Sequence, residues 1–286
     1  MVWCKGVGLA IGVLALVVVC AAAYGTWCWA EGTKALRARL EAARLPPATT
    51  RYDARDIESL PAPVQRFFRA VLKDGQPMVT AVSLEHSGTM NMSTTAQRWN
   101  PFTSMQRVIT RRPGFDWDAR IMMLPGVPVH VHDAYIAGAG LLRAAVFGLV
   151  RVASMQDTPE MAKGELLRFF AECAWYPTAL LPSQGVRWEA VDDSSARATL
   201  VDGATSATLT FRFQADGSIG GIRAESRGRA VDGVIGEAPW EGRFWNYETR
   251  DGMRIPIEGE IAWMLAEGPW PYWRGRTTAL AYEFAP

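Results

Sequence analysis

The hydrophobic pattern divides the chain into an apolar N-terminal segment and a long region of alternating residues. The first part is an uncharged run of 25 residues from Gly6 to Ala30. As a helix that rises about 1.5 Å per residue, it would extend roughly 37 Å, enough to cross a hydrocarbon core of about 30 Å. Trp3 precedes the run, and Trp27 and Trp29 lie at its end, as is typical of indole rings at the two membrane interfaces. The pattern predicts a retained transmembrane anchor over residues 1–30.

The alternative interpretation of this run is a cleaved signal peptide, with Ala21-Ala22-Ala23 as its small-residue cleavage site. We favour the anchor because the apolar run continues to Trp29. The basic residues that follow the run would keep the domain in the cytoplasm under the positive-inside rule, but long domains translocate largely regardless of nearby charge. The five residues that precede the run also stay inside most easily. We therefore expect a single-pass protein of the cell membrane with an extracytoplasmic domain.

A juxtamembrane segment and one β-rich domain are predicted after the anchor. Residues 31–55 are expected to form a charged helix that continues from the membrane, followed by a linker after Pro46 and Pro47, which end the helix. Residues 56–286 form the expected domain. It begins with a helix over residues 56–73, and the apolar stripe of this helix consists of Val64, Phe67, Phe68 and Val71.

Beyond this helix, apolar and polar residues alternate with the period of two that is typical of half-buried strands. In residues 115–121 the apolar side chains share one face, while Asp116, Asp118 and Arg120 share the other, which we expect to contact water. Further alternating segments follow between residues 186 and 284, separated mainly by Asp-Gly turns. About ten strands joined by tight turns predict an antiparallel sheet, which must curl, close or receive a helical cover.

The expected cover is a helical segment from residue 138 to residue 182. Apolar residues recur within it at helical spacing, namely Leu166, Phe169, Phe170 and Cys173. The predicted fold class is therefore α+β. An N-terminal transmembrane helix is followed by a curved antiparallel β-sheet, half-open and barrel-like, that is covered by helices.

Composition and charge narrow the classes of function. The net charge of +1 over 286 residues differs from the clustered basic surplus of nucleic-acid binders, so no nucleic-acid partner is expected. The sequence contains no Walker A loop, nucleophile elbow or paired Cys-x-x-Cys motif, so we predict no cofactor and assign no catalytic residue. Three of the 4 cysteines lie in or beside the apolar run, and Cys173 belongs to the apolar face of its helix.

Several motifs together resemble a bacterial family of membrane-anchored proteins that is known as a domain of unknown function. They are WNPFTSMQ from Trp99, PGFDWDA from Pro113, DAYIAGAG from Asp133, GELLRFFAECAWYPTALLP from Gly164 and GMRIPIEGEIAW from Gly252. The resemblance extends from Asp56 to Phe284 and implies no activity. The order of helix, curved sheet, helical insertion and meander is also similar, at the level of fold, to the periplasmic lipoprotein carriers, which wrap a half-open barrel around an apolar cavity.

The candidate ligand site combines one inward strand face with the polar stripe of the covering helix. By alternation, Asp133 shares the inward face with Tyr135, and a buried carboxylate needs a partner. Arg168 could pair with Asp133 or bind an anionic head group of a ligand. Glu172 lies on the same stripe as Arg168, and Trp175 follows where the helix ends. The predicted ligand-binding set is Asp133, Tyr135, Arg168, Glu172 and Trp175.

The two glutamates of this helix, Glu165 and Glu172, are not expected to form a glycosidase-type acid–base pair. The helix rise alone separates them by about 10.5 Å, which is longer than the spacings that such mechanisms use. Arg168 lies between them and is expected to keep both carboxylates ionised, whereas a general acid needs a raised pKa.

His130 and His132 support an alternative function. They are two residues apart on one strand face, a spacing found in metal sites, and they could serve a metal-dependent hydrolase if His86, Asp116 or Asp118 supplied a third ligand. The simpler interpretation is that both histidines are exposed on the outer face of the sheet.

We therefore expect a membrane-anchored protein that binds or handles an apolar, lipid-like ligand in the bacterial envelope, and we favour a binding protein over an enzyme. Residues 6–30 contact the membrane, and no protein partner is predicted. Tryptophans on inward faces would pack in the core or line a cavity, namely Trp99, Trp117, Trp188, Trp245 and Trp263. A structural interaction protein of the envelope is the third possibility, and it would present a flat apolar patch in place of a cavity.

Overall fold

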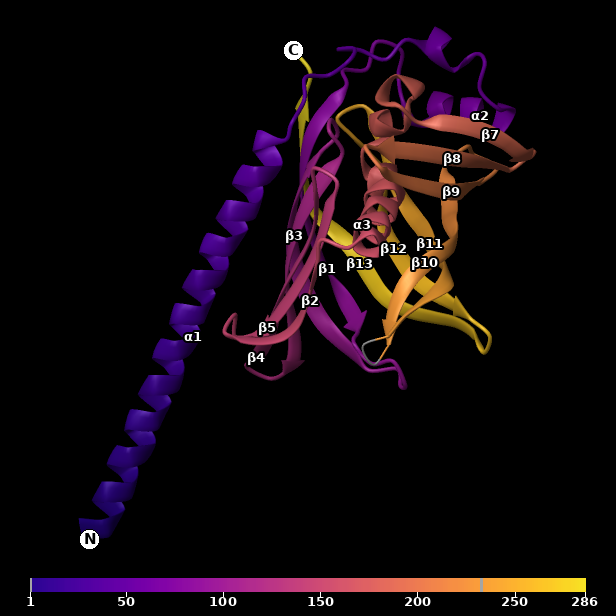
Figure 1. Ribbon diagram of the computed structural model, residues 1–286. Helices are drawn as coiled ribbons and strands as arrows, with labels where there is room; N and C mark the ends of the chain where they lie inside the picture. The colour runs from indigo at the N-terminus through magenta and orange to yellow at the C-terminus, as the bar shows by residue number, and fades with distance from the viewer. Residues whose placement is uncertain (1, 232–233) are drawn as a thin grey trace.

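A curved antiparallel sheet of 13 strands forms the body of the computed structural model, which describes residues 2–231 and 234–286 (Figure 1). The strands are β1 Val79–Asn91, β2 Trp99–Ile109, β3 Gly114–Leu124, β4 Val127–Ile136, β5 Ala139–Val146, β6 Val150–Gln156, β7 Arg187–Asp192, β8 Ser195–Asp202, β9 Thr205–Phe213, β10 Ile219–Val231, β11 Val234–Arg250, β12 Met253–Leu265 and β13 Gly268–Phe284. Their order across the sheet is β6-β5-β4-β3-β2-β1-β13-β12-β11-β10-β9-β8-β7. The pairing of β1 with β13 therefore joins the first six strands to the last seven.

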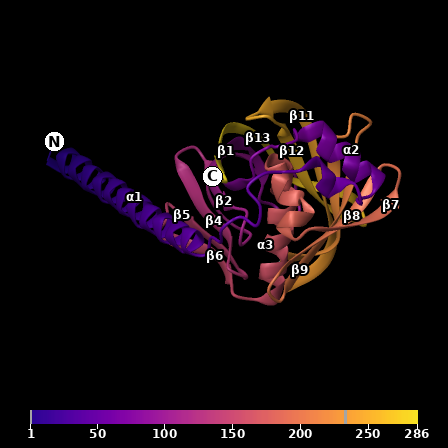
Figure 2. The same cartoon turned by 90° about the horizontal axis from the view of Figure 1, so that it is seen from above.

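Helices lie on both sides of this sheet. They are α1 Val2–Ala42, η1 Ala54–Ile57, α2 Ala62–Val71, α3 Pro159–Glu172, η2 Cys173–Trp175, η3 Pro177–Leu180 and η4 Pro182–Gln184. Helix α3 contacts β5 on one side and β9 and β10 on the other, so it lies inside the curve of the sheet (Figure 2). The main core fills the space between α3, α2 and the inner sheet face. The predicted α+β class with a half-open, curved antiparallel sheet is confirmed.

The local sequence explains where α3 begins and which face it buries. Thr158 caps the helix, because its hydroxyl oxygen accepts a hydrogen bond from the Met161 N–H at 3.2 Å, and Pro159 occupies the first turn. The predicted apolar stripe of this helix is buried, including Phe170 and the adjoining Cys173. Burial raises the pKa of the Cys173 thiol well above its usual value, as expected for an inert core cysteine.

The segment from residue 138 to residue 182 is helical only in part, which differs from the prediction. Strands β5 and β6 extend the sheet before α3 begins at Pro159. Small residues occupy much of β5, including Ala139, Gly140, Ala144 and Ala145, so the period of two is hardly visible in the sequence. The prediction of about ten strands therefore missed two strands in this segment.

Helix α1 packs its C-terminal half on the outer face of the sheet. Leu36 and Leu40 of α1 form a small second core with sheet residues that include Ala81, Ile109 and Ala134. From Gly6 onward this helix is long and apolar enough to cross a membrane. Figure 1 shows the N-terminal half of α1 extending away from the domain.

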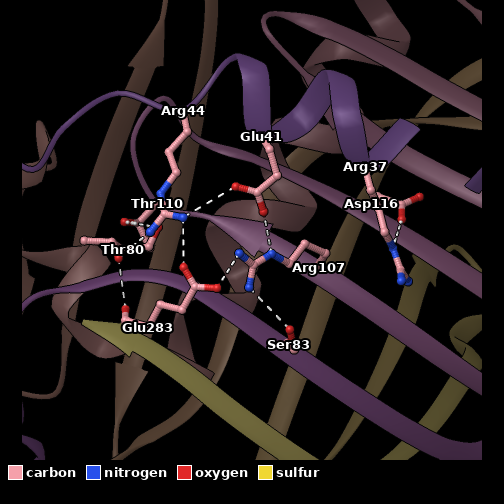
Figure 3. Close-up of polar contacts among 9 residues, drawn as sticks. All are labelled: Arg37, Glu41, Arg44, Thr80, Ser83, Arg107, Thr110, Asp116 and Glu283. Carbon is pink, nitrogen blue, oxygen red and sulfur yellow. Dashed lines mark hydrogen bonds and ion pairs between the residues drawn. The ribbon is translucent and has the colours of Figure 1, made fainter. Parts of the chain in front are cut away.

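Ion pairs attach the C-terminal end of α1 to the sheet (Figure 3). Arg107 of β2 donates hydrogen bonds to Glu41 at 2.7 Å and to Glu283 at 2.6 Å. Arg44 donates to the other oxygen of Glu283 at 2.8 Å. Arg44 is therefore engaged by the domain, although it belongs to the basic residues that follow the apolar run.

The outer face of β3 is covered by α1, which corrects the expectation that its acidic residues contact water. Asp116 is fully buried and accepts a hydrogen bond from Arg37 at 3.0 Å. Burial raises the pKa of Asp116 to about 6, although Arg37 acts in the opposite direction. Asp118 accepts a hydrogen bond from the Trp29 indole at 3.0 Å, while Arg120 is exposed as expected. Trp29 therefore lies against the sheet.

Candidate functional site

A cavity lies between α3 and the inner face of the sheet. Its volume is about 80 Å³, and it is partly open. Apolar side chains from five strands form most of its wall, among them Met90, Trp117, Trp240, Phe244, Ile261 and Trp273. Polar side chains also reach it, among them His86, Gln106, Asp133, Arg168, Glu172 and Arg227. An aromatic wall with a few convergent polar groups is the usual composition of a small-molecule site.

Arg168 of α3 bridges two carboxylates in the cavity wall. Its Nη1 donates to Asp133 Oδ2 at 2.5 Å, and its Nε donates to Glu172 Oε1 at 2.8 Å. The guanidinium carbon also lies 4.7 Å from the ring centroid of Trp117, and Gln106 donates to the second oxygen of Glu172 at 2.5 Å. Burial lowers the pKa of Arg168, but the Glu172 and Asp133 carboxylates outweigh it and raise this pKa above its usual value. The charge of Arg168 is thus neutralised within the protein.

Glu165 is buried beside Arg227, and this corrects the expectation that Arg168 keeps both glutamates of α3 ionised. Arg227 Nη2 donates to Glu165 Oε1 at 3.5 Å, and the Arg227 guanidinium lies 4.6 Å from the ring centroid of Trp240. Burial and the neighbouring Asp133 carboxylate raise the pKa of Glu165 well above its usual value. Glu165 therefore stays protonated over a wider pH range than an exposed glutamate does.

Five side chains in or beside the cavity wall carry buried polar atoms that have no hydrogen-bond partner among the described residues. They are both ring nitrogens of His86, the indole N–H of Trp175, the amide oxygen of Gln106 and one carboxylate oxygen each of Asp133 and Glu165. Once protonated, Glu165 can donate a hydrogen bond to Asp133, which contributes to its raised pKa. Burial, together with the nearby Arg168, lowers the pKa of His86 to about 3, so the ring is neutral and offers one donor and one acceptor. An unpaired buried polar group costs about 1–3 kcal/mol. The cavity therefore favours an occupant that supplies complementary hydrogen bonds.

The structure brings four of the five predicted ligand-binding residues to this one cavity. Asp133, Arg168, Glu172 and Trp175 line it, and Arg168 faces Asp133, which was one of the two predicted arrangements. Tyr135 does not line it. Its hydroxyl donates instead to an Asp202 carboxylate oxygen at 2.9 Å, beyond the cavity wall.

His130 and His132 lie beneath α1 and not on an exposed surface. The ring of His132 stacks on Trp29 with a centroid distance of 4.0 Å, and its Nε2 lies 2.7 Å from the Thr33 hydroxyl oxygen. Burial lowers the pKa of His132 to about 4. His86 lines the inner cavity instead of joining this pair. Within residues 2–231 and 234–286, no three His, Cys, Asp or Glu side chains come together as a group that could hold a metal ion.

The tryptophans divide between wall, core and outer surface. Trp117 lines the cavity, and Trp188 packs against Phe211 in the core. Trp245 was expected to face inward, but it lies partly exposed and donates to Glu258 at 2.7 Å. Sequence reasoning did not assign several wall residues to the site, namely His86, Gln106, Arg227, Trp240, Phe244 and Trp273.

Comparison with known proteins identifies relatives of unknown function. The model of a family described as a family of unknown function (DUF6920) matches residues 58–282. No curated protein matches the chain. A LolA superfamily protein from Nitrosomonas europaea is similar in structure, with 12% identity and a TM-score of 0.40 over 78% of this chain and 94% of that chain. A beta-barrel-like protein of the domain of unknown function DUF1849 from Brucella abortus is similar with 9% identity and a TM-score of 0.19, over 72% of this chain and 99% of that one.

Proposed function

The chain belongs to DUF6920, a family of unknown function, and we propose that its domain binds an apolar ligand with an uncharged polar end in the cavity beneath α3. The observation that carries the proposal is the combination of aromatic walls with unpartnered buried polar atoms in one partly open space. A fully packed core would satisfy or omit such atoms. A ligand that brings one donor and one acceptor would offset their desolvation.

The charges of the cavity support an uncharged polar end. Arg168 is neutralised by Asp133 and Glu172, and Arg227 lies beside Glu165, whose pKa is raised. An anionic head group would have to displace one of these carboxylates, which argues against the anionic ligand considered for Arg168. Ester, hydroxyl or amide groups match the neutral His86 ring and the Trp175 indole without adding a charge.

The size of the cavity restricts how such a ligand is held. At about 80 Å³ it is roughly half the size of a 150 Å³ cavity that accommodates benzene. Only the polar end and its first carbons fit beneath α3. The remaining hydrocarbon would extend out of the partly open cavity along its apolar wall, to which Met90 and Ile261 belong.

In this proposal the domain acts at the bacterial cell membrane as a binding protein and not as an enzyme. Helix α1 serves as the retained single-pass anchor, with the domain on the extracytoplasmic side. The adjacent bilayer supplies the apolar ligand in this proposal, because lipids are its main component.

Native mass spectrometry of the full chain, released from detergent, tests the proposal. Ala171 of α3 lines the cavity and is buried, so Ala171→Phe should fill the space. The matched control is Ala190→Phe at an exposed position of β7. We expect wild type and Ala190→Phe to retain one apolar molecule per chain that Ala171→Phe lacks, whereas lipid adhering to α1 should be equal in all three. Identical adducts in all three proteins would refute ligand binding in this cavity.

A further inference from the structure

Two hairpin tips of the sheet lie where the apolar helix leaves the domain. In an antiparallel sheet, successive connections alternate between two ends. The connections at 92–98, 125–126, 147–149 and 266–267 lie at one end, here called the tip end. The C-terminal end of α1 lies at the opposite end, because the Leu45 N–H donates to the Arg111 carbonyl oxygen at 2.7 Å. Helix α1 therefore runs along the sheet toward the tip end, as Figure 1 shows.

The exit point of α1 is marked by a close backbone contact. A side chain at Gly25 would collide with the Phe147 carbonyl oxygen, and one at Gly148 would meet the Gly25 carbonyl oxygen at 2.6 Å. Residues Gly6, Gly8 and Gly12 of α1 have only open space around them. The helix thus contacts the β5–β6 tip at Gly25 and continues beyond it.

The length of the exposed apolar helix places the membrane boundary at the level of the β5–β6 tip. The 19 residues from Gly6 to Tyr24 form an exposed apolar helix of about 28 Å, close to the hydrocarbon thickness of about 30 Å. Tyr24 and Trp27 are 61% and 59% exposed, at the positions where aromatic side chains mark an interface. If the helix crosses a bilayer, the hydrocarbon edge falls beside the β5–β6 tip.

The tips beside Gly25 present exposed apolar side chains. Leu124 at the end of β3 is 65% exposed, Leu149 between β5 and β6 is 41% exposed, and Val150 and Val152 of β6 are 64% and 57% exposed. Arg151 is exposed between the two valines and suits the lipid head groups. Adjacent large apolar residues on a surface usually mark an interaction site.

We propose that the β3–β4 and β5–β6 tips insert into the surface of the same bilayer that α1 crosses, with Leu124 and Leu149 as the inserted side chains. We assign lipid as the partner of these apolar side chains because α1 contacts the β5–β6 tip at Gly25 and its membrane-crossing part begins there. The domain then stands with its tip end on the membrane. Met90 and Tyr272, which line the cavity, lie toward the ends of β1 and β13 on this side, so this part of the cavity wall is the part nearest the bilayer.

Fluorescent labels on the full chain in vesicles test this insertion. Cys4, Cys20 and Cys28 are first replaced by alanine, while the buried Cys173 is kept. An NBD label is attached to a single cysteine in the variants Leu124→Cys and Leu149→Cys. The control variants, Val191→Cys and Val201→Cys, carry the label at exposed positions of β7 and β8. Vesicles of phosphatidylcholine and phosphatidylglycerol contain a nitroxide-labelled phosphatidylcholine as the quencher.

We expect nitroxide lipid to reduce emission from both tip labels and to leave both control labels unchanged, while aqueous iodide should do the reverse. Tip labels that iodide quenches as strongly as the controls would overturn the proposal. Tip labels shielded from both quenchers would indicate a second copy of the chain on this surface, which also overturns it. The inference rests on the proposed function of α1 as a retained anchor. Flotation of the chain with the vesicles tests this membrane attachment separately. A chain that fails to float overturns both the anchor and the insertion, whereas ligand binding in the cavity is unaffected by either result.

Discussion

Replacement of Arg168 by methionine tests whether the ion cluster holds α3 against the sheet. Methionine keeps an unbranched apolar side chain at this position but removes the charge. Asp133 then loses its ion pair and hydrogen bond with Arg168, whereas Glu172 keeps the hydrogen bond from Gln106. Removal of one partner from a buried ion pair costs about 3–5 kcal/mol, so we expect the free energy of unfolding to fall by that amount near neutral pH.

The loss should depend on pH in one direction. A buried carboxylate without a partner takes up a proton instead of remaining charged, so Arg168→Met should cost less at about pH 5 than at about pH 8. Combining Arg168→Met with Asp133→Asn should cost less than the sum of the two single substitutions, because the unpaired charge is then absent.

Urea unfolding of the detergent-solubilised chain, followed by tryptophan emission, measures these free energies. The control is Arg276→Met, because Arg276 pairs with Glu258 at 2.9 Å on the exposed face, where such pairs contribute about 0–1 kcal/mol. If Arg168→Met costs no more than Arg276→Met, or if the double variant shows simple additivity, the cluster does not stabilise α3 as described.

Three further predictions concern Glu165, Tyr135 and Gly25. Burial raises the pKa of Glu165, so its stabilising effect is complete below the unfolded pKa of about 4.3 and is lost as the pH rises toward the folded pKa. This loss is about 1.4 kcal/mol per pH unit, and Glu165→Gln should remove it. If the free energies of unfolding from urea titrations depend on pH equally in the variant and in wild type from about pH 5 upward, the prediction is contradicted. Tyr135→Phe loses the hydrogen bond to Asp202 and should cost about 1.5–3 kcal/mol, while native mass spectra should show the ligand retained, since Tyr135 does not line the cavity. Gly25→Leu should separate α1 from the β5–β6 tip, and unchanged amide hydrogen exchange at 147–149 would disprove this contact.

The second half of the sheet could be predicted from its sequence because local signals agree there. Asp-Gly turns separate alternating segments, and Gly217 and Gly252 in two of these turns adopt the positive φ that glycine favours. Glu258 and Glu260 of β12 pair with Arg276 and Arg274 of β13 across this hairpin. Strands β5 and β6 were missed because small and apolar residues predominate in them, which obscures the period of two.

The site could be predicted only where it follows a regular period. Asp133 and Arg168 were found because strand alternation and helix periodicity place them on inward faces. His86, Arg227 and Ile261 lie at irregularities of strand pairing, where the register shifts between neighbouring residues. A β-bulge shifts the alternation of inward and outward side chains by one residue. Beyond a bulge, alternation along the sequence therefore does not predict which face of the sheet a side chain occupies. The burial of Asp116 beneath α1 could not be predicted, because it depends on a contact between segments that are distant in the sequence.

A crystal structure of the full chain grown with a monoacylglycerol that carries bromine on the acyl carbon next to the ester tests the central claim most directly. This probe combines an uncharged polar end with a hydrocarbon chain, as the cavity requires. We predict an anomalous bromine peak between α3 and the inner face of the sheet, with the polar end within hydrogen-bonding distance of His86 or Trp175. Bromine peaks confined to the surface of α1, with only ordered water in the cavity, would contradict the proposed function.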